Sequence, residues 1–142
     1  MKIKSSIFLA IITALAVMMF PTETIAETQT PENISTITPI NDEISLQKIV
    51  TIMTVPEDNK LPWGFVKGGA SDYVERYPVI IQFFKGEDPV HVAQVDIKGD
   101  GSYEYKFRVR NVDHITGEIT NIFEGQYTVK IFKVIHNSDD TL

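Results

Sequence analysis

Apolar and polar side chains alternate one by one along much of the chain after residue 48. In the clearest stretch, residues 103–110, four apolar side chains alternate with four charged ones. Because successive side chains of a β-strand point to opposite faces, this pattern predicts a strand with one buried face. Residues 79–84 are apolar on both faces, which predicts an interior strand. Shorter patterns predict further strands at residues 48–55, 63–66, 93–98 and 127–131.

Turn-forming residues lie between these stretches. Glycine-containing turns are expected at residues 85–89 and 98–101, and a longer loop at residues 111–124. The last strand loses its alternation at residues 132–135, which indicates a β-bulge. No stretch shows the period of an amphipathic helix. About seven short strands separated by such turns predict an all-β chain that folds as a single antiparallel β-sandwich.

Residues 124–129 have the form of a tyrosine corner, in which a tyrosine near the start of a late strand bonds the backbone upstream of it. Tyr127 is the candidate tyrosine, and Gly125 lies in the turn before it. We expect the Tyr127 hydroxyl to hydrogen-bond a buried carbonyl. Trp63 is a candidate for a core aromatic residue.

Four short segments occur in an order that carries a family resemblance, namely residues 77–82, 92–96, 100–103 and 125–129. Together they resemble the immunoglobulin-like (Ig-like, or fibronectin III-like) domains of prokaryotic exported and cell-surface proteins, particularly archaeal ones from ammonia oxidisers. The resemblance covers about residues 65–135. It implies an Ig-like sandwich of the kind found in surface-layer-associated and adhesive proteins. Because the motifs are structural, they imply a fold and leave the activity open.

The N-terminus has the pattern of a secretory signal. Two lysines precede an uncharged apolar run at residues 7–20, and small residues follow it. This predicts a signal peptide over residues 1–26, cleaved between Ala26 and Glu27. The run is shorter than the ~20 residues that a spanning helix needs, and an uncleaved anchor is the alternative. We therefore expect an extracytoplasmic protein that is secreted, periplasmic or associated with the cell surface.

The composition divides the rest of the chain. Residues 27–47 are dominated by Thr, Pro, Glu, Asn and Ser without a sustained period, which predicts a flexible linker. Residues 48–136 form the predicted sandwich, and residues 137–142 a disordered tail. Asn33 begins an N-glycosylation sequon, which is usable only in a host that glycosylates.

Charge and cysteine content narrow the range of functions. The formal net charge is −6, and no stripe of Lys and Arg is present, so a nucleic-acid partner is not expected. The absence of cysteine excludes disulfides, thiolate metal sites and a cysteine nucleophile. No motif indicates catalysis, and we expect neither an enzyme nor a cofactor.

Metal binding has little support in the sequence. His91, His114 and His136 are far apart and show no short ligand spacing, which favours surface or turn positions. Residues 96–101 partly resemble a calcium loop. A lysine stands where an EF-hand requires an oxygen ligand, which favours a hairpin turn.

The phase of the strands selects a candidate interface. Val79, Ile81 and Phe83 suffice for an inner face, so Ile80 and Phe84 should point away from the core. Phe132 follows Lys130 on the outer face of the last strand, unless the predicted bulge has turned its side chain inward. These side chains could form an apolar docking patch, or isoleucines of the linker could fold back and cover it.

Three functional hypotheses remain open. The first is an Ig-like binding or structural module that contacts another extracytoplasmic or membrane protein. The second is an accessory subunit, without an active site, of a membrane-bound enzyme complex such as ammonia monooxygenase, as the resemblance implies. The third is a protein that binds carbohydrate or metal by itself. Contact with a membrane is expected only through the signal segment or a partner subunit.

Overall fold

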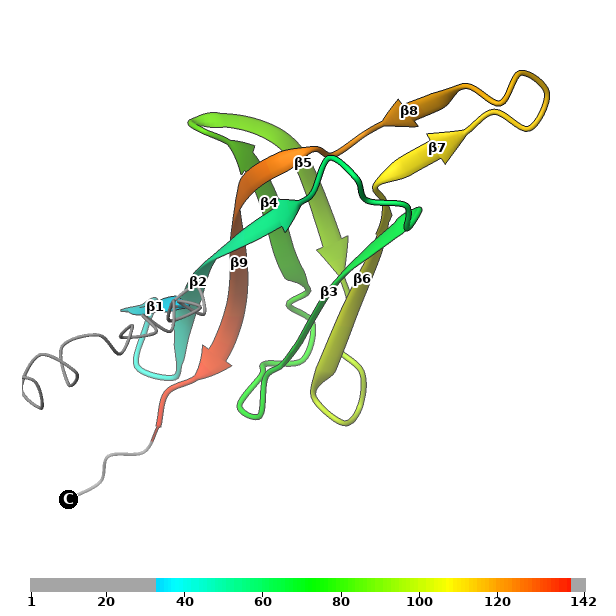
Figure 1. The fold of residues 1–142 in the computed structure, drawn as a ribbon. Helices are drawn as coiled ribbons and strands as arrows, with labels where there is room; N and C mark the ends of the chain where they lie inside the picture. Colours follow the sequence, from blue (N-terminus) through cyan, green and yellow to red (C-terminus); the bar gives the residue numbers. More distant parts are fainter. Residues whose placement is uncertain (1–32, 139–142) are drawn as a thin grey trace, which may run out of the picture. The chain divides into compact units, whose positions relative to one another are not determined.

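The computed structural model describes residues 33–138, which are all-β and contain no helix long and apolar enough to cross a bilayer (Figure 1). The predicted signal peptide and the Ala26–Glu27 cleavage site lie outside the described residues. The strands are β1 (Ile34–Pro39), β2 (Ile44–Val55), β3 (Trp63–Gly69), β4 (Val79–Lys85), β5 (Asp88–Val95), β6 (Ser102–Arg108), β7 (Arg110–Val112), β8 (Ile119–Asn121) and β9 (Gly125–His136).

The strands pair antiparallel into three sheets. The largest has five strands in the order β1-β2-β9-β4-β5, while β3 pairs with β6 and β7 pairs with β8. The last strand, β9, lies in the middle of the large sheet, because it pairs with β2 on one side and with β4 on the other. The interior position of β4 confirms the prediction from its two apolar faces.

The core lies between the large sheet and the β3–β6 sheet. In β4, Val79, Ile81 and Phe83 are fully buried, and the residues that alternate with them are not. The alternation that predicted these strands is therefore an alternation of core and surface, and the arrangement is β-sandwich-like. The core cluster consists of Val55, Val79, Ile81, Phe83, Tyr103, Phe107, Val109, Phe123, Tyr127, Val129 and Ile131.

Phe83 is the largest fully buried side chain, and aromatic rings surround it. Its ring centroid lies 5.1 Å from that of Phe107 and 5.5 Å from that of Phe123. The Phe123 ring in turn packs edge-on against Tyr127, with the centroids 5.2 Å apart. Tilted and edge-to-face pairs at such distances add to the gain from burying the rings. This cluster joins β4 of the large sheet to β6 and to the segment before β9.

The predicted linker and tail are ordered where the structure describes them. β1 and the start of β2 lie inside residues 27–47, so the expectation of a flexible linker is wrong for residues 34–39 and 44–47. β1 forms because it pairs with β2 along its whole length, a long-range interaction that composition does not reveal. At the other end, Asn137 is held by backbone and side-chain bonds to Glu43 and Asn41, although residues 137–142 were expected to be disordered.

Two further expectations about irregular structure need correction. The predicted loop over residues 111–124 contains the β7–β8 hairpin, which extends beyond the ends of the neighbouring strands (Figure 1). The Asp113 carboxylate accepts backbone amides of Ile115 and Thr116 in its turn, and these bonds lower the pKa of Asp113. The β2–β9 register runs without a break, so residues 132–135 contain no bulge toward β2; the register shift lies between Phe83 and Phe84, toward β5.

The two glycine turns have different roles. Gly86, with φ of 63°, makes a tight hairpin between β4 and β5. The turn at residues 98–101 leads from β5 in the large sheet to β6 in the small one, and the Asp100 carboxylate accepts the Ser102 amide and hydroxyl. Trp63 is exposed and stacks with Lys106 and Arg108, so it is not the core aromatic we expected.

Candidate functional site

The outer face of the large sheet carries the residues proposed as an interface. Ile80 and Phe132 are direct partners across β4 and β9, and Phe84 lies two positions further along the same face. All three are half-buried, whereas Ile81 and Phe83 beside them are fully buried. The strand register therefore groups the three side chains on the side away from the core.

The outer face is broader than these three residues. Lys48 and Lys130 supply positive charge, and no Asp or Glu of the five strands lies on this face. The Lys130 ammonium lies 4.2 Å from the centre of the Phe84 ring. No side chain of this face is fully buried, so no described element covers it. Its other apolar side chains are Ile34, Ile44, Leu46, Val50, Ile52, Val92 and Val134.

The isoleucines of residues 34–44 do not cover this patch. Ile34, Ile37 and Ile40 are each more than half exposed. β1 extends the sheet at its edge instead of folding over it, because it pairs with β2. Of the residues upstream of β2 that the structure describes, none shields Phe84 or Phe132.

The Tyr127 hydroxyl turns back to the backbone, but its partner differs from the one expected. It accepts a hydrogen bond from the Glu124 amide at 2.8 Å, where we expected it to donate to a carbonyl. Gly125 adopts a φ of 84°, which a residue with a side chain would take up only under strain. The Lys85 ammonium lies 4.4 Å from the centre of the Tyr127 ring and also bonds the Glu124 carbonyl.

Replacement Tyr127→Phe should lower the free energy of unfolding by about 1 kcal/mol, because the partly buried Glu124 amide loses its acceptor. Denaturant midpoints of the variant and the parent protein measure this effect. Tyr77→Phe is the control, since Tyr77 is exposed and should be neutral. Equal midpoints for all three proteins would show that the hydroxyl does not hold the turn.

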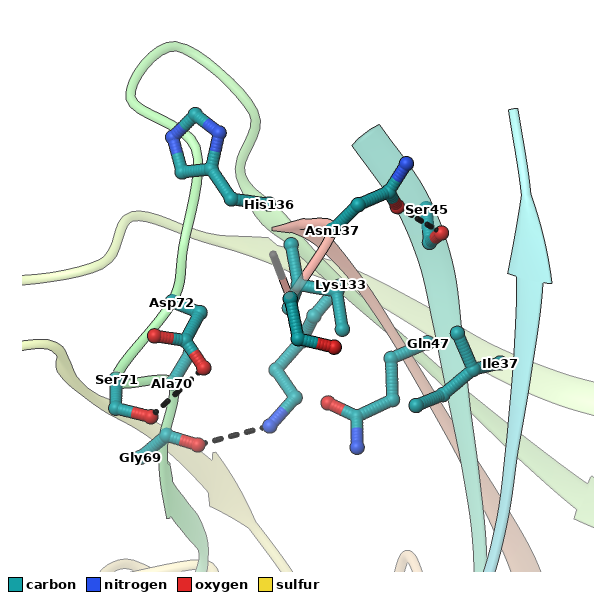
Figure 2. A pocket seen from close by; sticks show the side chains of 12 residues that line it. Ile37, Ser45, Gln47, Gly69, Ala70, Ser71, Asp72, Lys133, His136 and Asn137 are labelled. Carbon is teal, nitrogen blue, oxygen red and sulfur yellow. Dashed lines mark hydrogen bonds between the residues drawn. The ribbon is translucent and has the colours of Figure 1, made fainter. Parts of the chain in front are cut away.

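A polar pocket opens between the inner face of β2 and β9 and the end of β3 (Figure 2). Its volume is about 530 Å³. Lys133 reaches across it from β9, and its ammonium donates to the Gly69 carbonyl at 2.8 Å. Gln47, the direct partner of Lys133 in β2, points into the same space. Ser45, which is 4% exposed, bonds Asn137 at the rim.

Lys133 is the unusual residue of this pocket, because a lysine is seldom buried without a partner charge. The residue is only 5% exposed, and its side chain makes no ion pair with any carboxylate in the described part of the chain. Burial lowers the pKa of its ammonium group. One of its three N–H donors is used by Gly69, and its charge also lies 5.6 Å from the centre of the Tyr103 ring. The pocket therefore presents unused donors and a positive charge to a ligand.

Lys133 was not among the residues predicted to form a functional site. Lysine on a strand is expected to point to solvent, so its position was interpreted as a break in the alternation and hence as a bulge. The register shows that the alternation continues, and that Lys133 takes the inward position after Val129 and Ile131. The polar residue at an inward position of residues 132–135 was the signal that could have identified Lys133, but it was interpreted as a bulge.

The histidines do not come together. His91 bonds Tyr105, with His91 Nε2 and the Tyr105 hydroxyl 2.6 Å apart, and it packs in the aromatic cluster. His114 lies in the β7–β8 turn and His136 at the end of β9. Within residues 33–138, no three His, Asp or Glu side chains converge in a way that could hold a metal ion.

Comparison of the chain with protein-family models, curated proteins and solved structures finds no match. The resemblance to Ig-like domains of archaeal surface proteins is therefore based on the sequence motifs alone. The outer face and the Lys133 pocket are the features of the described residues that indicate a binding function.

Proposed function

We propose that the protein is an extracytoplasmic binding module that docks onto another protein through the outer face of its large sheet. The observation that carries this proposal is the patch formed by Ile80, Phe84 and Phe132, which no described element covers. An apolar patch with aromatic residues at its centre gains free energy when a partner removes it from water. Aromatic side chains are also enriched in the energetic centres of protein interfaces.

The charge of the face indicates the chemistry of the partner. Lys48 pairs with Phe132 across β2 and β9, and Lys130 lies over Phe84, so each lysine adjoins an aromatic ring. Acidic side chains around an apolar centre on the partner would complement this arrangement. Charge pairs of this type mainly steer association, so we expect binding to weaken as salt concentration rises.

The proposal also includes an Ig-like fold and export of the protein from the cytoplasm. The ordered sequence motifs, the two facing sheets and the Tyr127 bond support an Ig-like relationship. The strand order does not, because constant-type Ig sandwiches divide seven strands into four and three. Here five strands face two, and the last strand lies inside the larger sheet. The apolar run and small-residue cut site of residues 1–26 support export.

The second candidate is an accessory subunit of a membrane-bound enzyme complex such as ammonia monooxygenase, without an active site of its own. The outer face suits this role equally well, since a subunit interface also requires an uncovered apolar surface. The two candidates differ in the partner that they predict. A surface protein supports the first, and an integral subunit of an enzyme complex supports the second.

The double variant Phe84→Ser/Phe132→Ser tests the docking face. Tagged protein would be produced in its native host and cross-linked to neighbouring proteins, and the partners identified by mass spectrometry. We expect recovery of the specific partner to fall at least about 30-fold, because two central aromatic contacts are removed. The variant should remain folded, with a loss of about 1–2 kcal/mol for each partly buried ring, since neither side chain belongs to the core cluster.

Gln82→Ser/Gln94→Ser is the matched control, because it alters polar residues of the same face in β4 and β5. This control should leave recovery unchanged. If the aromatic double variant unfolds, the two side chains belong to the folding core. If it folds and still recovers the same partner, the docking face lies elsewhere on the protein.

A further inference from the structure

The β3 strand has an open edge, and its last residue, Gly69, lines the Lys133 pocket. The Val109 amide bonds the Pro62 carbonyl and the Ala70 amide bonds the Gly101 carbonyl, both at 2.8 Å. These bonds fix the phase of the antiparallel β3–β6 pair, so the even-numbered residues of β3 share hydrogen bonds with β6. The backbone groups of Phe65 and Lys67 therefore point away from β6. In residues 33–138, no other strand pairs with this edge.

A groove runs along this edge, beneath the inner face of β2. Its floor is formed by Ile49 and Met53, which are partly buried against the core. The groove has a volume of about 440 Å³, and Lys133 and Gly69 line both this groove and the polar pocket beside it. The groove exists because the large sheet has five strands and the facing sheet only two, so the inner face of β2 extends beyond β3.

The charge at the junction of groove and pocket is unbalanced. A buried ammonium group is costly unless an anion or several acceptors surround it. Lys133 has one carbonyl acceptor, Gly69, and no carboxylate partner in the described chain. Asp72 lines the pocket but is not within ion-pair distance of Lys133; its carboxylate contacts Ser71 instead. The space around Gly69 is open, because a Cβ at that position would meet no atom within 4 Å.

We propose that the groove binds an extended peptide segment of another protein, which adds as a strand to the free edge of β3 and places an Asp or Glu carboxylate against Lys133. Backbone hydrogen bonds to Phe65 and Lys67 would supply affinity, as in other cases of strand addition. Alternate side chains of the segment would lie over Ile49 and Met53. The carboxylate would take the free donors of Lys133 and set the position of the segment. This site lies on the opposite side of the large sheet from the outer face and is independent of the docking proposed there.

Two synthetic peptides test the proposal. The probe is acetyl-Thr-Asp-Thr-Val-Thr-Val-Thr-amide, in which the aspartate and the valines share one face of a strand and the aspartate lies at one end, as Lys133 does relative to Ile49 and Met53; the comparison peptide has Asn in place of Asp. Each would be titrated into isotope-labelled protein and followed by NMR. We expect the amide signals of Phe65 and Lys67 to shift. We also expect the Asp peptide to bind at least about 10-fold more tightly than the Asn peptide, as for a charged hydrogen bond.

Lys133→Met should abolish the preference for the Asp peptide while keeping the shape of the side chain. Lys130→Met is the matched control, since Lys130 lies on the same strand and points to the opposite face. The preference should survive in that variant. If Lys133→Met does not fold, the comparison of the two peptides on the unaltered protein decides the question.

Two results would overturn the proposal. One is equal affinity of the unaltered protein for the Asp and Asn peptides. The other is protection of the Phe65 and Lys67 amides from hydrogen exchange, together with no shift of their NMR signals at millimolar peptide. That second result would mean that another part of the chain or a second copy already fills the groove.

Discussion

Replacing Phe83 with alanine should lower the free energy of unfolding by about 3–5 kcal/mol, which is a large part of the ~5–15 kcal/mol that stabilises a typical domain. Phe83 has no exposed surface, and its ring contacts Phe107 and Phe123 at the centre of the aromatic cluster. Alanine would leave a cavity among rings that are held from both sheets. Equilibrium denaturation followed by far-UV circular dichroism measures the loss.

The adjacent residue provides the matched control. Phe84→Ala removes the same atoms as Phe83→Ala. Phe84, however, points to the outer face, where it is half-buried and contacts Lys130. We expect Phe84→Ala to cost about 1–2 kcal/mol, because a partly buried ring and its cation–π contact with Lys130 are lost without leaving a closed cavity. Similar losses for the two variants would mean that the outer face is covered in the native protein, and would count against the docking proposal.

Strict alternation made the core strands predictable from the sequence. In β6, and in β9 as far as Ile131, the inward positions hold the buried apolar residues, so a period of two marked both the strands and their faces. β4 was predicted as an interior strand because it is apolar on both faces. The outward orientation of Phe84 and Phe132 followed from the same phase. These strands have both a buried and an exposed face, and this difference is what the sequence records.

β1, β7 and β8 were not predicted, because their sequences show no contrast between a buried and an exposed face. All six residues of β1 are exposed, and β1 is stabilised by its pairing with β2 instead of by a buried face. β7 and β8 have three residues each, too few to show a period. Trp63 was a candidate for a core aromatic residue, but Gly64 takes the inward position beside Phe107.

The groove next to β3 could not have been predicted at all. It depends on Lys133 facing inward, on the open edge of β3 and on the position of β2, which are far apart in sequence. A lysine on a strand is indistinguishable in sequence from the many that face solvent. Only the register between β2 and β9 shows that Lys133 belongs to the inner face.

Gly68→Ala should lower the free energy of unfolding by about 2–3 kcal/mol, at the upper end of the effects expected for overpacking. Gly68 is paired with Tyr103, whose ring lies directly over the glycine backbone. A Cβ at Gly68 would stand 2.7 Å from Tyr103 Cε1 and closer still to the hydroxyl end of the ring. Tyr103 is 3% exposed and has little freedom to move, so β3 would have to shift away from β6. Thermal or denaturant unfolding measures the effect.

Gly69→Ala separates this clash from the general effect of placing alanine in a strand. A Cβ at Gly69 would meet nothing within 4 Å, and the backbone there does not have positive φ. The change should therefore be neutral or stabilise by up to ~1 kcal/mol, because alanine restricts the unfolded chain. If the Tyr103 ring is the obstacle, Tyr103→Ala removes it, and the double variant Gly68→Ala/Tyr103→Ala should be more stable than the sum of the single effects predicts. Additive losses would instead mean that the strain of Gly68→Ala lies in the β3 backbone. The close approach of Gly68 to the Tyr103 ring would then not be the reason for glycine at this position.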